Sequence, residues 1–493
     1  MPHLTAELIL ACVLLPITYY LYRAARDPLR SAPGPFLARF TRLWYLKAVH
    51  KGDFELQNIQ LHRQYGPIVR VAPNWYSISD LDAAATIYNT QNVFPKSKWY
   101  FAFQQPDEPN IFSTHNNKYA AELRRKYKPA FDVFHVYEYA VDDCSKILEQ
   151  RLSEFAASES EADLGWWLTC YAFDVNGQIA FSKRFGHLDE GKDVGNIAAA
   201  LAERLDYVSH VGIYPSLHRL FWKLVMVMTF VTKQIDYTYV FAQNQLDGHQ
   251  RRRDLETGKS SEPPDMLDRF LDFHKQNPNH FTKNDVLIGA YSSIAAGADS
   301  TWISLGSIIH YVHKYPETLR KLRAEIDMMT REGKISDPVT FEESKKMPYL
   351  NAVIKEAQRM HSPTGFPLWR VVPESGATLC GRYFPPGTTV GVNIWVAHRS
   401  SAFDPDPDIF RPERWLEADK KQLAKMNASY MPFGMGPRIC QGQIIAMMEM
   451  GKIIPQLFRR FDFDLSPDWQ TFNHWLVGHK GLNGKVKCRE NPT

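Results

Sequence analysis

Helical periodicity of apolar residues dominates the middle of the chain. From about Lys118 to Lys314, apolar residues recur at every third or fourth position, the spacing that gives an α-helix one buried face. The longest predicted helix begins near Thr282, a residue type favoured at helix N-termini, and ends before Pro316, which cannot extend it. Because this segment is apolar around much of its circumference, we expect it to cross the core.

Two shorter stretches predict β structure. Between residues 65 and 87, apolar and polar residues alternate around prolines, which favours short strands followed by a helix. Residues 365–396 are rich in Val, Thr and Pro and indicate a second small β portion. By contrast, the polar run QRRRDLETGKSSEPPD at residues 250–265 contains helix breakers and predicts a surface loop. The expected fold class is mainly α with a minor β portion, in one body over residues 37–493.

The N-terminus departs from this pattern. The run Thr5–Tyr22 carries a single charge, Glu7, and as a helix it would be about 27 Å long, roughly the thickness of a bilayer core. Three arginines follow it: Arg23, Arg26 and Arg30. Positive residues after a span favour a cytoplasmic location for the rest of the chain. A cleaved signal peptide is the alternative, but its charges would precede the apolar run. We therefore predict a single transmembrane helix within an anchor at 1–30, and a stiff proline-rich hinge at 31–36.

Composition excludes several classes of protein. Hydrophobic residues make up 44% of the chain and charged residues 23%, values that allow a substantial core. The net charge of +4 is small and the basic residues are spread out, so we expect no nucleic-acid partner. The six cysteines are scattered and form no CxxC pair, which argues against a disulfide scaffold or a structural zinc site.

One cysteine lies in a distinctive stretch, MPFGMGPRICQG. Its spacing, FxxGxRxCxG, is set by Phe433, Gly436, Arg438, Cys440 and Gly442. Glycines let the backbone approach a flat group and leave N–H groups free to point at sulfur. An arginine and a helix start beside a cysteine favour its thiolate form. A lone cysteine in such a turn would be a buried structural thiol, but five matched positions favour a ligand.

This stretch resembles the heme-binding loop of the cytochrome P-450 family, which are heme-thiolate monooxygenases. Ala446 and Glu449 stand where the family's next helix usually has these residues. The resemblance implies the P-450 fold and a heme b cofactor whose iron takes Cys440 as axial ligand. It also implies that Arg438 binds a heme propionate and that the loop residues around it contact heme.

The resemblance extends to IAAGADST, residues 294–301, inside the longest predicted helix. A glycine inside a helix costs about 1 kcal/mol relative to alanine, and close helix packing is the usual explanation. The family's motif implies instead that Ala296 and Gly297 leave room for dioxygen, while Asp299 and Ser300 relay protons. Serine stands where the family usually has threonine, and Thr301 follows as a second candidate hydroxyl.

Further matches concern the brace and the propionate sites. Glu356 and Arg359 have the i, i+3 spacing of one helix face, and Arg414 follows in FRPERW. The resemblance implies that these three residues form a structural network behind the heme loop, which we call the brace. It also implies that Arg124 and Arg370 bind propionates. The family often has Trp or His four residues before the arginine that corresponds to Arg124, and here Ala120 occupies this position.

By resemblance, the chain oxidises, typically by hydroxylation, a lipophilic small molecule with O2 and electrons from NADPH through a cytochrome P-450 reductase. Outside the main motifs, the sequence is similar to fungal microsomal members of the pisatin demethylase and benzoate hydroxylase type. This similarity implies a role in secondary metabolism at the endoplasmic reticulum membrane, with the catalytic domain facing the cytoplasm. Two alternatives remain open: a reductase-independent heme-thiolate isomerase or dehydratase, and a non-enzymatic heme binder. The acid and alcohol at positions 299 and 300 favour the monooxygenase over both.

Overall fold

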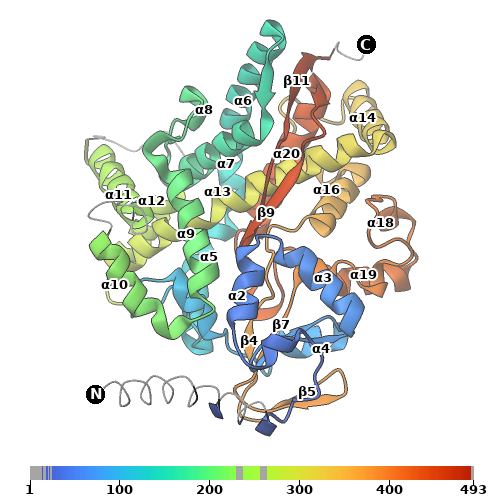
Figure 1. Cartoon of the computed structure of the whole chain (residues 1–493). Helices are drawn as coiled ribbons and strands as arrows, with labels where there is room; N and C mark the ends of the chain where they lie inside the picture. The colour runs from blue at the N-terminus through green and yellow to red at the C-terminus, as the bar shows by residue number, and fades with distance from the viewer. Residues whose placement is uncertain are drawn as a thin grey trace, which may run out of the picture.

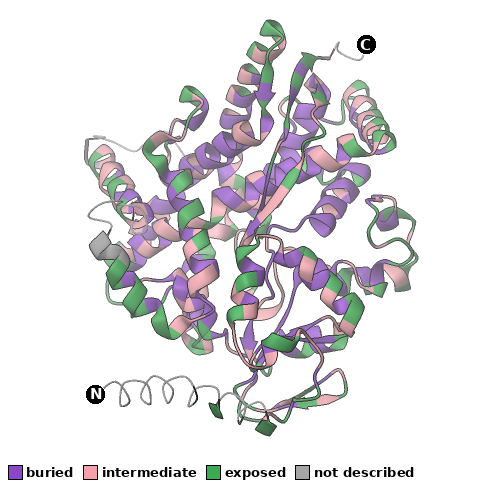
Figure 2. Cartoon of the chain, viewed as in Figure 1, coloured by how far each residue is buried: buried purple, intermediate pink, exposed green. Residues whose placement is uncertain are grey.

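Helix α13 (Lys283–Lys314) crosses the centre of the molecule, as its sequence predicts (Figure 1). Thr282 caps its N-terminus in a capping box with Asp285, and Pro316 opens the next helix after Tyr315. Helix α7 (Leu164–Phe181) lies along α13, and both are buried over most of their length (Figure 2). The apolar circumference of α13 is therefore explained by neighbours on several sides.

This computed structural model describes residues 25–228, 237–255 and 264–489, together with Leu14, Thr18, Tyr19 and Tyr22. The other helices are α2 (Leu43–His50), α3 (Phe54–Tyr65), α4 (Leu81–Ile87), α5 (Asn117–Asp132), α6 (Glu138–Ser158), α8 (His187–Glu190), α9 (Ile197–Val211), α10 (His218–Met228), α11 (Tyr237–Leu255), α12 (Met266–Gln276), α14 (Pro316–Arg331), α15 (Phe341–Ser344), α16 (Pro348–Met360), α17 (Ile394–Ala397), α18 (Arg414–Glu417), α19 (Lys420–Ser429) and α20 (Gln443–Arg460). Short 3-10 turns include η2 (Lys98–Phe103) and η7 (Gly436–Arg438).

The β structure is minor and confirms both predicted regions. A four-stranded sheet has the order β1 (Ile68–Ala72), β2 (Trp75–Ile78), β7 (Thr389–Val392) and β4 (Arg370–Val371). Strands β2 and β7 are parallel, so the two predicted β regions form one sheet. The remaining strands are β3 (Glu161–Asp163), β5 (Ala377–Leu379), β6 (Arg382–Phe384), β8 (Phe461–Leu465), β9 (Gln470–His474), β10 (Leu476–Lys480) and β11 (Asn483–Cys488).

The predicted surface loop at residues 250–265 is wrong in its first part. Helix α11 continues to Leu255, because its arginines find partners while remaining helical. Arg252 donates to the carbonyl oxygen of Phe181 at 2.8 Å, and Arg253 pairs with Asp268 of α12. Residues 256–263 lie outside the described part of the chain.

The predicted anchor lies largely outside the described residues. Across the described ranges, no helix combines the length and apolar content that a bilayer span requires. The predicted hinge at 31–36 is held against the four-stranded sheet, since the N–H of Arg70 donates to the carbonyl oxygen of Pro33 at 2.8 Å.

Candidate active site

The cysteine loop presents its thiol instead of burying it. Cys440 follows η7 and precedes α20, and its N–H donates to the carbonyl oxygen of Phe433 at 2.9 Å, which closes the loop. Its side chain is exposed, whereas Cys144 and Cys170 are buried. A side chain on Gly436 would place its Cβ 2.0 Å from the carbonyl oxygen of Tyr88, so only glycine fits there.

The surroundings of this thiol combine opposing effects on its ionisation. Desolvation by the surrounding protein raises the pKa of Cys440. The backbone N–H groups of Gly442 and Gln443 and the guanidinium of Arg124 act in the opposite direction, because each stabilises a thiolate. The loop therefore aims donors at the sulfur, as a thiolate ligand to iron requires.

Four cations from separate segments lie close to this loop. Lys96 interacts electrostatically with Arg370, Arg438 and Arg124, and Arg438 also interacts with Arg370 and Arg124. Their hydrogen bonds go to neutral acceptors: Arg438 donates to the carbonyl oxygen of Thr114 at 2.8 Å, and Arg370 to that of Trp369 at 3.0 Å. Within the described residues none of the four forms an ion pair. The cluster therefore fits a ligand that carries carboxylates, as heme does.

Lys96 is the member of this cluster that the sequence did not predict. It is 6% exposed, and its ammonium donates to the carbonyl oxygen of Phe112 at 2.7 Å. Burial, followed by the charges of the three arginines, lowers the pKa of Lys96 well below its ordinary value. No helical or strand periodicity marks this lysine, so only its position in the fold distinguishes it from exposed Lys98 two residues later.

Along α13, one stripe of side chains remains unburied in the middle of the helix. Ile288, Ser292, Ala295, Ala296 and Ser300 follow the helical spacing of one face and are all at least partly accessible, as are their neighbours at 291, 293 and 297. Ala296 is exposed although it lies in the middle of a helix that crosses the core, so other side chains do not fill the space beside this face, and we call this space the hollow. Helix α20, which follows the cysteine loop, packs against α13.

The three predicted catalytic residues of α13 differ in their surroundings. Asp299 is 9% exposed, and burial raises its pKa to about 6, although the indole N–H of Trp302 donates to it at 3.2 Å. The hydroxyl of Ser300 donates to the carbonyl oxygen of Ala296 at 3.0 Å, on the accessible stripe. Thr301 is buried and donates to the carbonyl oxygen of Gly297. The hollow is thus accessible to Ser300 and not to Thr301.

Gly297 has a packing explanation. A side chain there would place its Cβ 1.9 Å from Nδ2 of Asn176 on α7, and this amide donates to the carbonyl oxygen of Ser293 at 2.9 Å. Close approach of α7 therefore requires glycine at 297. Ala296 is the small residue that faces the hollow.

The predicted brace is present and fully buried. Glu356 accepts hydrogen bonds from Arg359 at 2.8 and 2.9 Å, from Nε of Arg414 at 2.9 Å and from Nε1 of Trp415 at 2.9 Å. Arg359 donates to the carbonyl oxygen of His398, whose ring accepts the N–H of Met431 at 2.9 Å. The network thus reaches the first residue of the cysteine loop.

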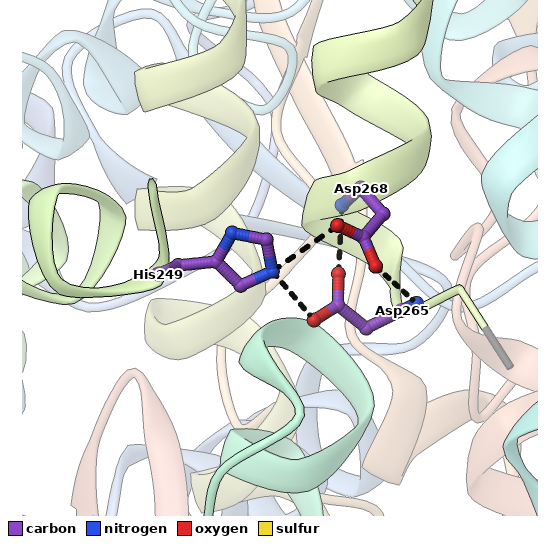
Figure 3. A group of neighbouring side chains, drawn as sticks. All are labelled: His249, Asp265 and Asp268. Atoms are coloured by element: carbon purple, nitrogen blue, oxygen red, sulfur yellow. Dashed lines mark hydrogen bonds and ion pairs between the residues drawn. The ribbon is translucent and has the colours of Figure 1, made fainter. Parts of the chain in front are cut away.

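A second polar cluster lies elsewhere, where α11 meets the start of α12 (Figure 3). Nε2 of His249 lies 2.9 Å from a carboxylate oxygen of Asp265 and 3.4 Å from one of Asp268. The two aspartates form a capping box at the start of α12, and Asp268 also pairs with Arg253. Since the helix cap and the arginine use these oxygens, the cluster is a structural tie between the two helices.

Comparison with known proteins finds a family profile and several relatives that cover most of this chain. Residues 33–485 match the family profile described as Cytochrome P450. A pisatin demethylase of Fusarium vanettenii is 33% identical over 470 residues, covering 94% of this chain and 91% of that protein. A cytochrome P450 monooxygenase of Aspergillus terreus is 34% identical, covering 91% and 94%, and the monooxygenase gsfF of Penicillium aethiopicum is 32% identical, covering 96% of each.

Proposed function

Because this chain belongs to the cytochrome P450 family, and is therefore an oxygenase enzyme that binds heme b through a cysteine thiolate, we propose that it hydroxylates a lipophilic small molecule in fungal secondary metabolism. Electrons would come from NADPH through a cytochrome P-450 reductase. The observation that carries the proposal is the exposed thiol of Cys440, with backbone N–H donors aimed at it beside four cations that lack anionic partners.

Heme fits this site by the chemistry of its residues. Cys440 would hold the iron, while Arg438, Arg124 and Arg370 would bind the propionates, with Lys96 as a fourth cation. The backbone around Gly436 and Gly442 would accommodate the ring, with Phe433 beside it. The bound group supplies activation of dioxygen; the protein supplies the ligand, the counter-charges and the proton path.

We propose that Asp299 and Ser300 deliver protons into the hollow beside α13. Asp299, with a pKa of about 6, releases and regains a proton near neutral pH. Both hydroxyls donate to helix carbonyl oxygens, but Ser300 is partly accessible from the hollow, whereas Thr301 is buried on the packed side. A relay through Ser300 would also explain why serine suffices where the family usually has threonine.

Asp299→Asn tests this function. We expect NADPH-dependent product formation with a reductase to fall about a hundredfold, since a positioned acid typically contributes at least this much. The heme spectrum should be unchanged, because position 299 is away from the thiol. Unchanged product formation would contradict the relay. Asp272→Asn, an exposed change on α12, is the matched control.

The same variant predicts a change in stability with pH. The pKa of Asp299 is about 6 in the fold and 3.8 ordinarily, so the folded protein binds more protons between these values and loses stability as pH rises through them. Asn removes this penalty. We therefore expect the variant to gain up to roughly 3 kcal/mol above pH 6 and nothing below about pH 4, measured by denaturant unfolding of the heme-free protein.

Lys96→Met provides a test of the cation cluster. Removing a buried charge that has no anionic partner should stabilise the heme-free protein, while loss of a charged hydrogen bond to heme should speed heme dissociation about tenfold or more. Transfer of heme to apomyoglobin measures the dissociation. Lys98→Met, an exposed change two residues away, should alter neither quantity. If Lys96→Met destabilised the heme-free protein, the cation would be satisfied without heme.

We also propose that residues 1–30 anchor the protein in the endoplasmic reticulum membrane, with the catalytic domain in the cytoplasm. The apolar run Thr5–Tyr22 and the arginines that follow it support this orientation. The full chain should remain in the membrane pellet after alkaline carbonate extraction, and a chain beginning at Ser31 should be released to a greater extent. Equal release of the two would contradict the anchor.

A further inference from the structure

A buried arginine on α9 lacks an anionic partner. Arg204 is 6% exposed, and within the described residues it forms no ion pair. Its Nη1 has no hydrogen-bond partner, and its Nη2 lies 3.4 Å from the carbonyl oxygen of Gln104. A buried guanidinium left unpaired is costly, so its retention calls for a ligand that completes it.

Arg204 lines a small cavity of about 30 Å³. Gln104 also lines it; this residue is 8% exposed, and its side-chain oxygen has no partner. Trp222 of α10, Tyr239 of α11 and Ile288 and Tyr291 of α13 also line the cavity. Its volume holds about one water molecule or a group of similar size. Glu108, the acidic residue in this lining, is exposed and forms no ion pair with Arg204.

The guanidinium is held in a fixed orientation. It lies 5.0 Å from the ring centre of Trp222 and 5.6 Å from that of Tyr207. These contacts stabilise the cation, while Nη1 stays without a hydrogen-bond partner. A guanidinium edge matches the two oxygens of a carboxylate better than any neutral acceptor.

The cavity and the proposed site of oxidation lie along the same face of α13. Ile288 lies on the accessible stripe of α13 that also carries Ala296 and Ser300. The eight residue steps from Ile288 to Ala296 correspond to about 12 Å along the helix axis. A group bound at Arg204 would therefore hold an elongated molecule along the hollow, with its far end near Ala296.

We propose that Arg204 binds a carboxylate, so that the substrate is a lipophilic carboxylic acid oxidised at a carbon remote from its acid group. The inference rests on the proposed monooxygenase function and deepens it by assigning a substrate class. It gives Arg204 the role of positioning the substrate, since the guanidinium binds the end of the molecule that does not react.

The test uses dodecanoic acid and its primary amide as a matched pair of probes. Binding of each to the heme-loaded full chain is measured by equilibrium dialysis at pH 7.5. We expect the acid to bind at least tenfold more tightly than the amide. Arg204→Gln should reduce this ratio to about one, and Arg204→Lys should retain part of it, because lysine keeps the charge but not the planar fork.

Arg219→Gln is the control, because Arg219 is an exposed arginine on α10 whose ion pair with Asp107 borders the neighbouring cavity. It should leave the ratio unchanged. Equal affinity of the wild-type protein for acid and amide would overturn the proposal and leave Arg204 with a bound water, as would an acid preference that survives in Arg204→Gln. Dialysis does not depend on the heme spectrum, so these results are distinct from a missing thiolate band, which would contradict the proposed function itself.

Discussion

Replacing Cys440 by histidine is expected to move the absorption band of the reduced, carbon monoxide-bound protein from about 450 nm to about 420 nm, because imidazole donates less electron density to iron than thiolate does. Cys440→Ala should instead lose heme during gel filtration. The histidine variant keeps a ligand at the same position, so its spectrum reports on the ligand even if alanine impairs folding. Product formation should fall by at least a hundredfold in both variants.

Cys488→Ala is the matched control for this experiment, since Cys488 is the other exposed cysteine among the described residues and ends β11. It should retain the band near 450 nm and full activity. A wild-type band near 420 nm in freshly prepared protein would contradict the thiolate ligand. So would a histidine variant with an unchanged spectrum.

Linear spacing predicted the parts of the site that lie within short segments. The cysteine loop and the Glu356–Arg359 pair depend on contacts between residues close in sequence, so their patterns are visible along the chain. The course of α13 was predicted for a similar reason, because its cap, its apolar surface and the proline after it are local features.

What was missed depends on contacts between distant segments. Lys96 resembles any lysine until the fold brings three arginines near it, and Arg204 becomes notable only when α9, α10 and α13 enclose its cavity. Gly297 illustrates a further limit. Its sequence context suggested room for a ligand, but Asn176, more than a hundred residues earlier, explains why glycine is required.

Helix α11 shows why local composition misled the loop prediction. Its polar C-terminal turn looks like solvated loop, yet Arg252 reaches a carbonyl oxygen of α7 and Arg253 reaches Asp268. Long side chains can thus bind polar groups of neighbouring elements while the backbone stays helical. Tertiary contacts decided the boundary here, and sequence composition alone does not report them.

Glu356→Gln should cause the largest loss of stability among single changes outside the cysteine loop. The carboxylate is the shared partner of Arg359 and Arg414, and all three side chains are nearly or completely inaccessible to solvent. Glutamine has the same shape but no charge, so two buried guanidinium groups would lose their counter-ion. Breaking a buried pair in this way costs about 3–5 kcal/mol. Denaturant unfolding of the heme-free protein measures the loss.

The comparison with Glu413→Gln separates burial from charge. Glu413 also pairs with a cation, Lys321 at 2.8 Å, but both side chains are partly exposed, so we expect a loss of at most about 1 kcal/mol. Equal losses of unfolding free energy in the two variants would show that burial of the Glu356 network adds nothing to the cost of removing its charge. Because Arg359 is linked through His398 to Met431 of the cysteine loop, Glu356→Gln should also speed heme dissociation, whereas Glu413→Gln should not.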